Sequence, residues 1–497
     1  MRARDLNGHY NRPGTCTLSQ WRIGILLLWS TLASAQNWTP SDPFNTLATA
    51  PTSPSGQLMT QDREEPCDLG PLGTPLTLLE ATERALCYSP RTRNSWANIK
   101  VQAAQLGQSK ASYLPTLAAS VARVSDHSSS TYTSDLVSNT DTRSQYNTET
   151  LSLNWLLFDF GARSAAVKNA KDLLAAAEAN HDAQLQQVFA STARDYYVAI
   201  AGQANIEATR ATEGIALQGL DIASTRVKEG LSAISDQWQA QTTAAQSTFN
   251  RVRAEGEYKK ALGTLAIDMG LAPDTPIQLT QDLDGARPNT DFIQSIQALL
   301  TQAQRAHPSL IAARAQVDAA QAHVKQATAQ GRPTVNLVMR RSGNNQPVSL
   351  GTGLPTISAQ NNDTYLGIEV NIPIFEGFGR HYQQRAAQAE VERQAANLQD
   401  AEQQVSINVW NSYQTLQVET ENLHNTDVVL DSAKRALTAT QYRYQKGVGG
   451  LLELLNSQNG LANALLQHIQ AQTNWRNARL QLAASLGQLT NLDLLRP

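Results

Sequence analysis

The chain carries the same plan twice, and this duplication constrains its fold more than any other feature. The two copies share landmarks at an offset of 217 or 218 positions: Pro90 with Pro308, Pro115 with Pro333, Asp159 with Glu376, Arg226 with Arg443, Gly230 with Gly447, Tyr258 with Trp475 and Gly270 with Gly487. Seven pairs in one order at a nearly constant offset are hard to obtain by chance. We therefore predict two structural repeats, over residues 76–285 and 286–490.

Each repeat contains two runs of alternating apolar and polar residues. The runs lie at 116–124 and 150–158 in the first repeat, and at 334–340 and 364–375 in the second. Period-two alternation predicts strands, so we expect strand pairs, each with a polar loop, over 116–158 and 334–375. Leu151, Leu153 and Trp155 would share one face of their strand. An apolar face opposite a polar face fits a membrane strand and equally a soluble sandwich.

Helical patterns of unusual length follow the strands. Residues 162–229 contain no proline, and at 1.5 Å per residue they would form a helix of about 100 Å. The segment 378–446 is nearly as long. Gly230 and Gly447 are C-cap signals, and shorter helices would return over about 235–270 and 452–487. The helices before Pro115 and Pro333 have a similar length, so two short helices can stack end on end beside each long one.

The first 35 residues have the pattern of a cleaved signal peptide. Four arginines precede the apolar run IGILLLWSTL at 23–32, and Ala33-Ser34-Ala35 supplies a cleavage site. A short buried helix is the alternative, but it fits the arginines poorly. We expect export, with a Pro-rich lead-in over 36–75. The net charge of −3 and the pI near 6.3 favour neither nucleic acid nor an anionic membrane surface as a partner.

Two cysteines remain once Cys16 leaves with the signal. In an oxidising compartment Cys67 and Cys87 allow one connectivity, so we predict a disulfide between them. Two buried free thiols are the alternative. The bridge would fasten the Pro/Gly-rich lead-in to the helical segment that ends at Cys87.

Two strand pairs leave each chain with four strands, too few to close a barrel, and an open sheet edge is not tolerated in lipid. Three chains would supply twelve strands, an even number within the range of outer-membrane barrels. The expected fold is therefore mainly helical with membrane strands: a trimeric, twelve-stranded β-barrel that continues into a long α-helical barrel. A hollow tube that is wet on both walls would also explain the low hydrophobic content and the many alanines at helix seams.

The duplicated plan and three motifs resemble the TolC family of outer-membrane channel-tunnels. The motifs are LFDFG with IFEGFG at the strand-to-helix change, and the paired turns RVKEGLSAISD and RYQKGVGGLLE. The likeness covers roughly residues 76–490, and the cysteine-bracketed start is similar to the type I secretion branch. The resemblance implies an outer-membrane channel whose helical tunnel lies in the periplasm.

The resemblance also implies a gate at the periplasmic tip, near Gly230 and Gly447. By motif, Tyr444 matches a gate tyrosine, Asp236 the carboxylate of the first repeat and Glu453 a constriction acid. Asn456 stands where the family can carry a second acid, and Gly449 where it can carry an arginine. The closing ion pair must therefore use another residue or be absent.

Arg226 and Arg443 are nearby candidates for that ion pair, although ordinary helix-end cations are the alternative. Glu453 could likewise be a solvated residue at a helix start. An adaptor's helical hairpins would dock at Gly230–Asp236 and Gly447–Glu453.

The strand-to-helix motif is interpreted as architecture. Phe158 and Phe375 would lie at the rim of the membrane, where aromatic side chains tolerate a half-wet setting. Asp159 and Glu376 would favour the helix N-termini. Glycines would permit the sharp change of direction, at Gly161, Gly377 and Gly379.

The sequence contains no constellation typical of an enzyme. The eight histidines lack zinc-ligand spacing, and no Walker loop or G-x-S-x-G motif occurs, so we expect no catalytic residue, cofactor or metal. Energy would come from an inner-membrane ABC exporter or another pump, through a periplasmic adaptor. We therefore expect the outer component of a tripartite type I secretion system that exports a protein toxin. Small-molecule efflux is the alternative, and a non-channel periplasmic coiled-coil scaffold is a third, less favoured interpretation.

Overall fold

The computed structural model describes residues 42–48, 51–55, 67, 69–133, 139–280, 295–349 and 356–487. The chain divides into a small unit, Met1–Ala48, and a large unit, Thr49–Pro497. In the small unit the carboxylate of Asp42 accepts hydrogen bonds from Leu47 N and Thr46 Oγ1. The predicted signal peptide, 1–35, lies outside the described residues. All elements below belong to the large unit.

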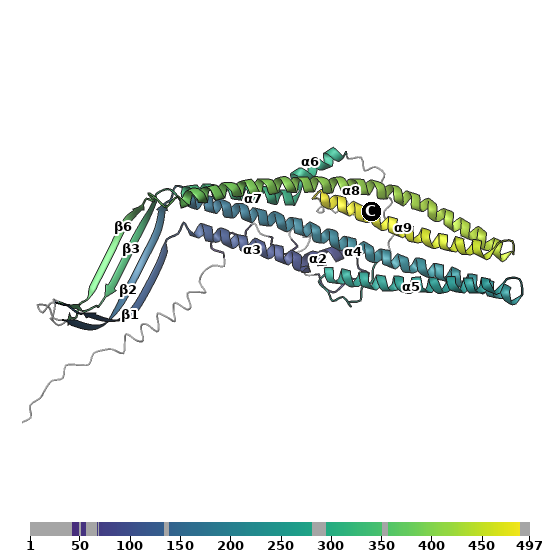
Figure 1. Ribbon diagram of the computed structural model, residues 1–497, viewed down its shortest axis with the longest axis horizontal. Helices are drawn as coiled ribbons and strands as arrows, with labels where there is room; N and C mark the ends of the chain where they lie inside the picture. The colour runs from purple at the N-terminus through teal and green to yellow at the C-terminus, as the bar shows by residue number, and fades with distance from the viewer. Residues whose placement is uncertain are drawn as a thin grey trace, which may run out of the picture. The chain divides into compact units, whose positions relative to one another are not determined.

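The helices of the large unit confirm the duplication (Figure 1). The first repeat contains α2 (Leu78–Tyr88), α3 (Pro90–Ala111), α4 (Ala162–Lys228) and α5 (Ile234–Asp268). The second contains α6 (Ile296–Ala306), α7 (Pro308–Ala329), α8 (Gly379–Gln445) and α9 (Leu451–Ser485). Matching helices have equal lengths of 11, 22, 67 and 35 residues. A helix of 67 residues spans about 100 Å.

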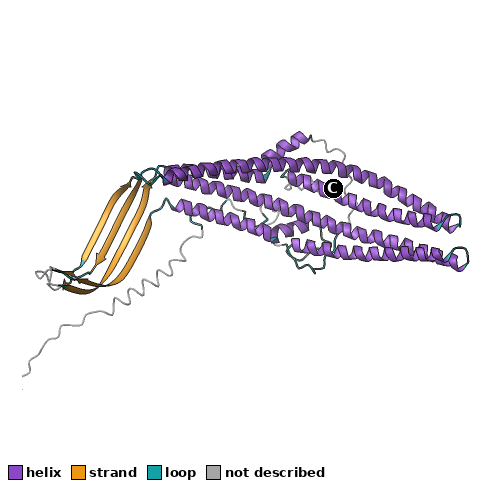
Figure 2. Cartoon of the chain, viewed as in Figure 1, coloured by secondary structure: helices purple, strands orange, loops and turns teal. Residues whose placement is uncertain are grey.

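Four strands pair into one antiparallel sheet of order β1-β2-β3-β6 (Figure 2). They are β1 (Thr116–Ser130), β2 (Thr140–Phe158), β3 (Thr334–Asn344) and β6 (Asn361–Asn371). The first hairpin extends further into its loop than the alternation predicts, whereas β6 ends two residues before Pro373, which has no N–H to donate. The second loop also contains the short pair β4 (Val348–Ser349) and β5 (Thr356–Ile357).

The ladder places most of the large apolar residues of the four strands on one face. Directly opposed residues share a face of a sheet, and the register sets Leu117, Leu153, Met339 and Leu366 in one row. A second row contains Trp155, Leu337 and Ile368. The opposite face carries rows such as Asn154 with Val338 and Gly367. Every large apolar side chain of β1 and β6 on the first face is exposed in the single chain.

The long helices bury narrow seams rather than one central core. Helix α4 packs along α3, α5, α7 and α9, and α8 packs along α7 and α9. Much of the buried surface of α4 is alanine, which permits the close approach of helix backbones. Leucine-rich clusters interrupt these seams, for example around Leu185, Phe189 and Leu480.

The helix that precedes each strand pair is broken, which corrects the expectation of one continuous helix. Ser89 and His307 separate α2 from α3 and α6 from α7, and a proline begins the second helix of each pair. Proline is tolerated at the first helical position but ends a preceding helix, because it lacks the N–H and disfavours helical backbone before it. Helices α3 and α5 still lie beside α4, one toward each end, as predicted.

Part of the lead-in is fastened to α2. Cys67 and Cys87 form a disulfide with a Cα–Cα distance of 5.4 Å. The buried Arg84 guanidinium donates to the backbone carbonyls of Leu69, Gly70 and Pro71 at 3.2, 3.1 and 2.7 Å. Since α2 packs on α4, these contacts connect the lead-in to the helical wall.

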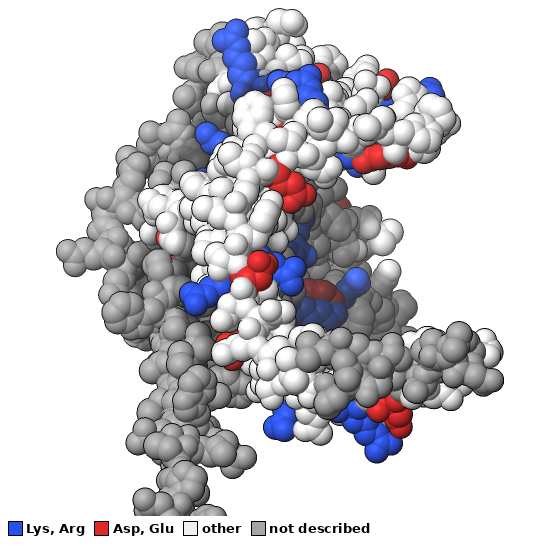
Figure 3. Space-filling model, turned by 90° about the vertical axis from the view of Figure 1, so that its left-hand side faces the viewer, with Lys and Arg blue, Asp and Glu red and all other residues white. Residues whose placement is uncertain are grey.

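Charges of both signs are interspersed on the end of the molecule that carries the strands (Figure 3). Lys, Arg, Asp and Glu side chains lie among a majority of uncharged residues on this face. A mixed surface of this kind gives no support to a nucleic-acid partner.

Candidate functional site

The turns between the long and the returning helices form the candidate gate. Helix α4 ends in a Schellman motif, in which Gly230 has φ 75° and Leu231 N donates to Arg226 O at 2.8 Å. Helix α8 ends in the same way: Gly447 has φ 76°, and Val448 N donates to Arg443 O at 3.0 Å. Both glycines adopt the left-handed conformation that a C-cap requires.

The two helical hairpins of one chain share a small core near these turns. Tyr444 is only 2% exposed and packs with Ala223 and Ala240 of the first repeat and with leucines of α9. The tyrosine therefore stands between the hairpins rather than in solvent.

Arg226 connects the first repeat to the second. Its Nη1 donates to Tyr444 O at 3.0 Å, and its Nε donates to Ser232 Oγ at 3.3 Å. The guanidinium carbon lies 5.0 Å from the centre of the Tyr444 ring, within the range of a cation–π contact. Because the two residues are 218 positions apart, this contact holds the α4/α5 hairpin to the α8/α9 hairpin.

The hydroxyl of Tyr444 is buried and has no hydrogen-bond partner among the described residues. Burial raises the pKa of this phenol, the charge of Arg226 lowers it, and the charge of Asp236 raises it. Asp236 is thus close enough to act on the ring electrostatically, and it lies in the first turn of α5. An orphan buried hydroxyl beside a carboxylate is an arrangement that a small shift of the hairpins would change.

Glu453 is paired with Arg443 of the same hairpin. Arg443 Nη1 donates to Glu453 Oε1 at 2.7 Å, and their side chains are 53% and 40% exposed. Glu453 also lies in the first turn of α9, where the helix N-terminus favours a carboxylate. The carboxylate therefore carries a counter-charge within its own hairpin, and Asn456, one turn later, adds none.

Gly449, where the sequence comparison led us to expect that an arginine could stand, lies in a sterically tight position. A Cβ at this position would lie 3.1 Å from both Arg443 Cβ and Tyr444 N. Gly449 N also donates to Arg443 O at 3.1 Å. A side chain at position 449 would therefore crowd the backbone and side chain of the arginine that pairs with Glu453.

The first strand-to-helix junction is organised by a buried ion pair. Asp159 accepts hydrogen bonds from Gly161 N at 3.2 Å and from Arg163 N at 2.8 Å, and Arg163 Nε approaches it to 3.0 Å. Arg163 also donates to the carbonyls of Leu156 and Leu157. Both side chains are about nine-tenths buried, so the pair locks the end of β2 to the start of α4.

The second junction uses the same residue types in a more open setting. Glu376 and Arg380 form a bidentate pair with exposed fractions of 43% and 29%. Hydrogen bonding to Arg380 lowers the pKa of the Glu376 carboxyl. No backbone N–H donates to the Glu376 side chain among the hydrogen bonds of the described residues, in contrast to Asp159.

The prediction that three glycines permit the change of direction from strand to helix is correct for two of them and wrong for the third. Gly161 and Gly377 have φ 92° and 59°, but Gly379 is the first residue of α8 and has no positive φ. Two aromatic residues take the left-handed conformation instead: Phe160 with φ 53° and Phe378 with φ 64°. Their rings pack edge-on against Phe158 at 4.8 Å and Phe375 at 5.4 Å. Sequence reasoning missed these residues, although both precede or follow a motif glycine.

Within the described ranges no group of three His, Cys, Asp or Glu side chains could hold a metal ion. No helix in those same ranges combines the length and the apolar character needed to cross a membrane.

Known proteins with the same plan identify the family. The family of outer membrane efflux proteins matches residues 81–270 and 299–488. Protein CyaE of Bordetella pertussis is 34% identical over 418 residues, which cover 83% of this chain and 84% of that one. Outer membrane protein TolC of Escherichia coli is 22% identical over 424 residues, 84% and 83% of the two chains. The outer membrane protein VceC from Vibrio cholerae has the same fold, with a TM-score of 0.68, 24% identity and coverage of 83% and 96%. The chain therefore belongs to the outer membrane efflux protein family.

Proposed function

We propose that this protein is a trimeric channel-tunnel that serves as the outer component of a tripartite type I secretion system. The observation that carries the proposal is the sheet: four strands with an exposed apolar face and two unpaired edges. Among the described strands, β1 pairs only with β2 and β6 only with β3. Unpaired edges are costly in lipid, and three copies joined β6 to β1 would close twelve strands.

The helices support the same assembly. In the far half of the bundle α5 and α8 are the outer helices of the row, because α4 and α9 lie between them. Helix α5 exposes Trp238, Phe249 and Val252, with exposed fractions of 62%, 60% and 55%. Helix α8 exposes Val418 and Val428. Contact between α5 of one copy and α8 of the next would bury both sets.

In this assembly the tips form the periplasmic gate. Tyr444 and Asp236 would hold the closed arrangement, and Glu453 and Asn456 would border the constriction. Arg226 and Arg443 contribute contacts within the chain, and an adaptor would bind around Gly230 and Gly447. Residues 1–35 would be removed on export, 36–75 would form the lead-in, and 76–285 and 286–490 the two repeats.

The energy for transport would come from an inner-membrane ABC exporter joined through a periplasmic adaptor. The likeness to CyaE supports protein export, and the family description supports small-molecule efflux as the second candidate. Deleting the gene in its own host and measuring release of a type I cargo protein and resistance to efflux substrates separates the two. Loss of release with unchanged resistance supports secretion, and the reverse result supports efflux.

The channel itself is tested with purified protein in detergent. Native mass spectrometry should find a trimer, and electrophoresis should show a band whose mobility changes on heating. Planar bilayers should show ion conductance. A stable monomer, or an even-numbered ring, would rule the trimeric channel out.

A further inference from the structure

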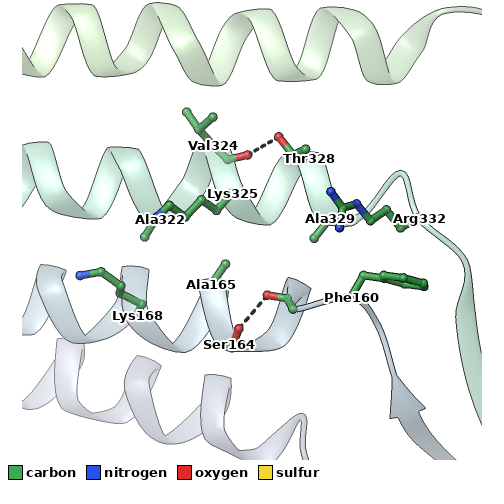
Figure 4. A pocket seen from close by; sticks show the side chains of 11 residues that line it. Phe160, Ser164, Ala165, Lys168, Ala322, Val324, Lys325, Thr328, Ala329 and Arg332 are labelled. Carbon is green, nitrogen blue, oxygen red and sulfur yellow. Dashed lines mark hydrogen bonds between the residues drawn. The ribbon is translucent and has the colours of Figure 1, made fainter.

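A basic cavity lies where β2 and β3 meet their helices. It has a volume of about 420 Å³ and is lined by the first turns of α4 and the last turns of α7 (Figure 4). Three cationic side chains line it, Lys168 from α4 and Lys325 and Arg332 from α7 and the turn that follows, and no carboxylate does. Figure 4 shows Lys168 across from Ala322 and Lys325, with Phe160 beside Arg332 at the strand end.

The nearby carboxylates already have cations of their own. Asp172 accepts from Lys168 Nζ at 2.8 Å, and Asp159 pairs with Arg163. Asp318 acts on Lys168 as well. Neither Lys325 nor Arg332 forms an ion pair with a carboxylate among the described residues. Ser164 and Thr328 donate their hydroxyls to backbone carbonyls, so these two cations are the available charges of the cavity.

One wall of the cavity adjoins the apolar face of the sheet through Phe160. A bulge between Leu156 and Phe158 brings Phe158 opposite Val335, which shares the apolar face with Leu337. Phe160 lines the cavity and packs against Phe158, with ring centres 4.8 Å apart. Arg332 lies 5.8 Å from the Phe160 ring. Arg332 therefore stands just beyond the end of the apolar rows, two residues before β3 begins, and Lys325 lies further along α7. In the proposed channel this is the height at which a lipid would change from acyl chain to headgroup.

The first repeat provides an internal comparison. The positions of the first repeat that match Lys325 and Arg332, 218 residues earlier, are Gly107 and Leu114. Both repeats make the same helix-to-strand change at these positions, from α3 to β1 and from α7 to β3, so that change does not by itself require cations. A function of the α4/α7 junction alone has to account for them.

We propose that this cavity binds the phosphate of an anionic phospholipid, with Lys325 and Arg332 as its counter-charges and the acyl chains along the apolar face beside Phe158. Basic pockets at the membrane boundary bind headgroups in this way. Arginine suits a phosphate because its planar guanidinium donates two hydrogen bonds side by side. The proposal rests on the membrane-embedded channel proposed above.

The test is native mass spectrometry of the purified full-length protein with phosphatidylglycerol or phosphatidylcholine added to the detergent. We expect wild type to retain phosphatidylglycerol and to lose it by about tenfold or more in Lys325→Gln/Arg332→Gln. Lys325→Arg/Arg332→Lys should retain it. The control Lys171→Gln/Arg385→Gln removes the same charge from exposed positions outside the cavity and should bind as wild type does.

Three results would overturn the lipid site. They are equal retention of the two lipids by wild type, an equal loss in the control variant, and displacement by millimolar inorganic phosphate, which would make the cavity a site for the free ion. If the protein forms no trimer and enters no membrane, the proposed channel fails together with the lipid site. A trimer with normal conductance but no lipid preference overturns the lipid site alone.

Discussion

The ion pair with Arg443 weakens the electric field that the carboxylate of Glu453 exerts on nearby ions. An exposed ion pair contributes little to stability, typically no more than about 1 kcal/mol. Its effect on ions is larger, because a guanidinium 2.7 Å away cancels most of the field that a carboxylate would project into a narrow pore. The constriction proposed at Glu453 and Asn456 would therefore be less acidic than the sequence motif alone indicates.

Arg443→Gln should accordingly increase cation selectivity in planar-bilayer recordings and strengthen block by multivalent cations. Glu453→Gln should have the opposite effect, because it leaves three arginines near the axis of the proposed trimer. The double variant should return close to wild type. If neither single variant shifts the reversal potential, Glu453 does not border the pore.

Asp159 and Glu376 are equivalent in the duplication but differ in burial. Asp159→Asn leaves Arg163 buried without its counter-charge, which should lower stability by about 3 kcal/mol. Glu376→Gln breaks an exposed pair and should cost at most about 1 kcal/mol. The temperature at which the heat-modifiable band is lost compares the two. Equal shifts would show that burial does not distinguish the junctions.

At the scale of elements, periodicity predicted the long helices to within one or two residues at each end. Long segments without proline and with a glycine at the C-cap leave few alternatives. The breaks at Pro90 and Pro308 could have been read from the sequence, because proline ends a preceding helix. The contacts of Arg226 with Tyr444 and of Arg332 with Phe160 could not, because they join elements that only the tertiary arrangement brings together.

Asp268, the last residue of α5, forms a carboxyl pair with Asp195 that makes the stability of the protein depend on pH. Burial, with the hydrogen bond and charge of Asp195, raises the pKa of Asp268 from 3.8 to about 6, against the charges of Arg91 and Arg194. Between these values the folded state binds more protons than the unfolded state. Stability therefore falls as pH rises from about 4 to 6, and the loss persists at neutral pH.

Asp268→Asn should remove this dependence and stabilise the protein at pH 7 by about 1 to 2 kcal/mol, a figure reduced for solvent screening. Burial lowers the pKa of His181 to about 4, which acts in the opposite direction over the same range. The comparison is therefore the difference in melting temperature between variant and wild type from pH 4 to 8. The exposed carboxylate of Glu257 on the same helix, changed to Gln, is the control. A difference that does not vary with pH would contradict the assignment.

The disulfide between Cys67 and Cys87 ties the lead-in to α2. Cys67→Ala/Cys87→Ala should leave the helices intact, because α2 keeps its packing on α4. It should free the part of the lead-in before Leu69, because Arg84 still holds Leu69, Gly70 and Pro71. We expect a protease to cut between residues 56 and 68 at least several times faster in the variant. Peptide mapping without reductant should recover the two cysteines as one linked pair from periplasm-folded protein. Recovery of both as free thiols would show that the bridge does not form.

At the scale of the whole molecule, the duplication accounts for the proposed assembly. Each repeat contributes two strands, one long helix and the shorter helices beside it. The helical wall formed by one chain therefore has a different outer helix on each side, α5 on one and α8 on the other. Such a head-to-tail contact closes into a ring only if the angle between copies divides a full turn. The sequence predicted the number of strands, whereas the identity of the outer helices required the structure.

The surface of α5 provides the corresponding test of the ring. Phe249→Asp places a charge where an aromatic side chain would be buried between copies, and a loss of about 2 to 4 kcal/mol per interface is expected for such an anchor. Native mass spectrometry should show a larger fraction of monomer at each detergent concentration. Val198→Asp on α4, also an exposed apolar residue but on an inner helix of the row, should leave the trimer intact. If Phe249→Asp assembles like wild type, α5 does not face the next copy, and the ring must close through another surface.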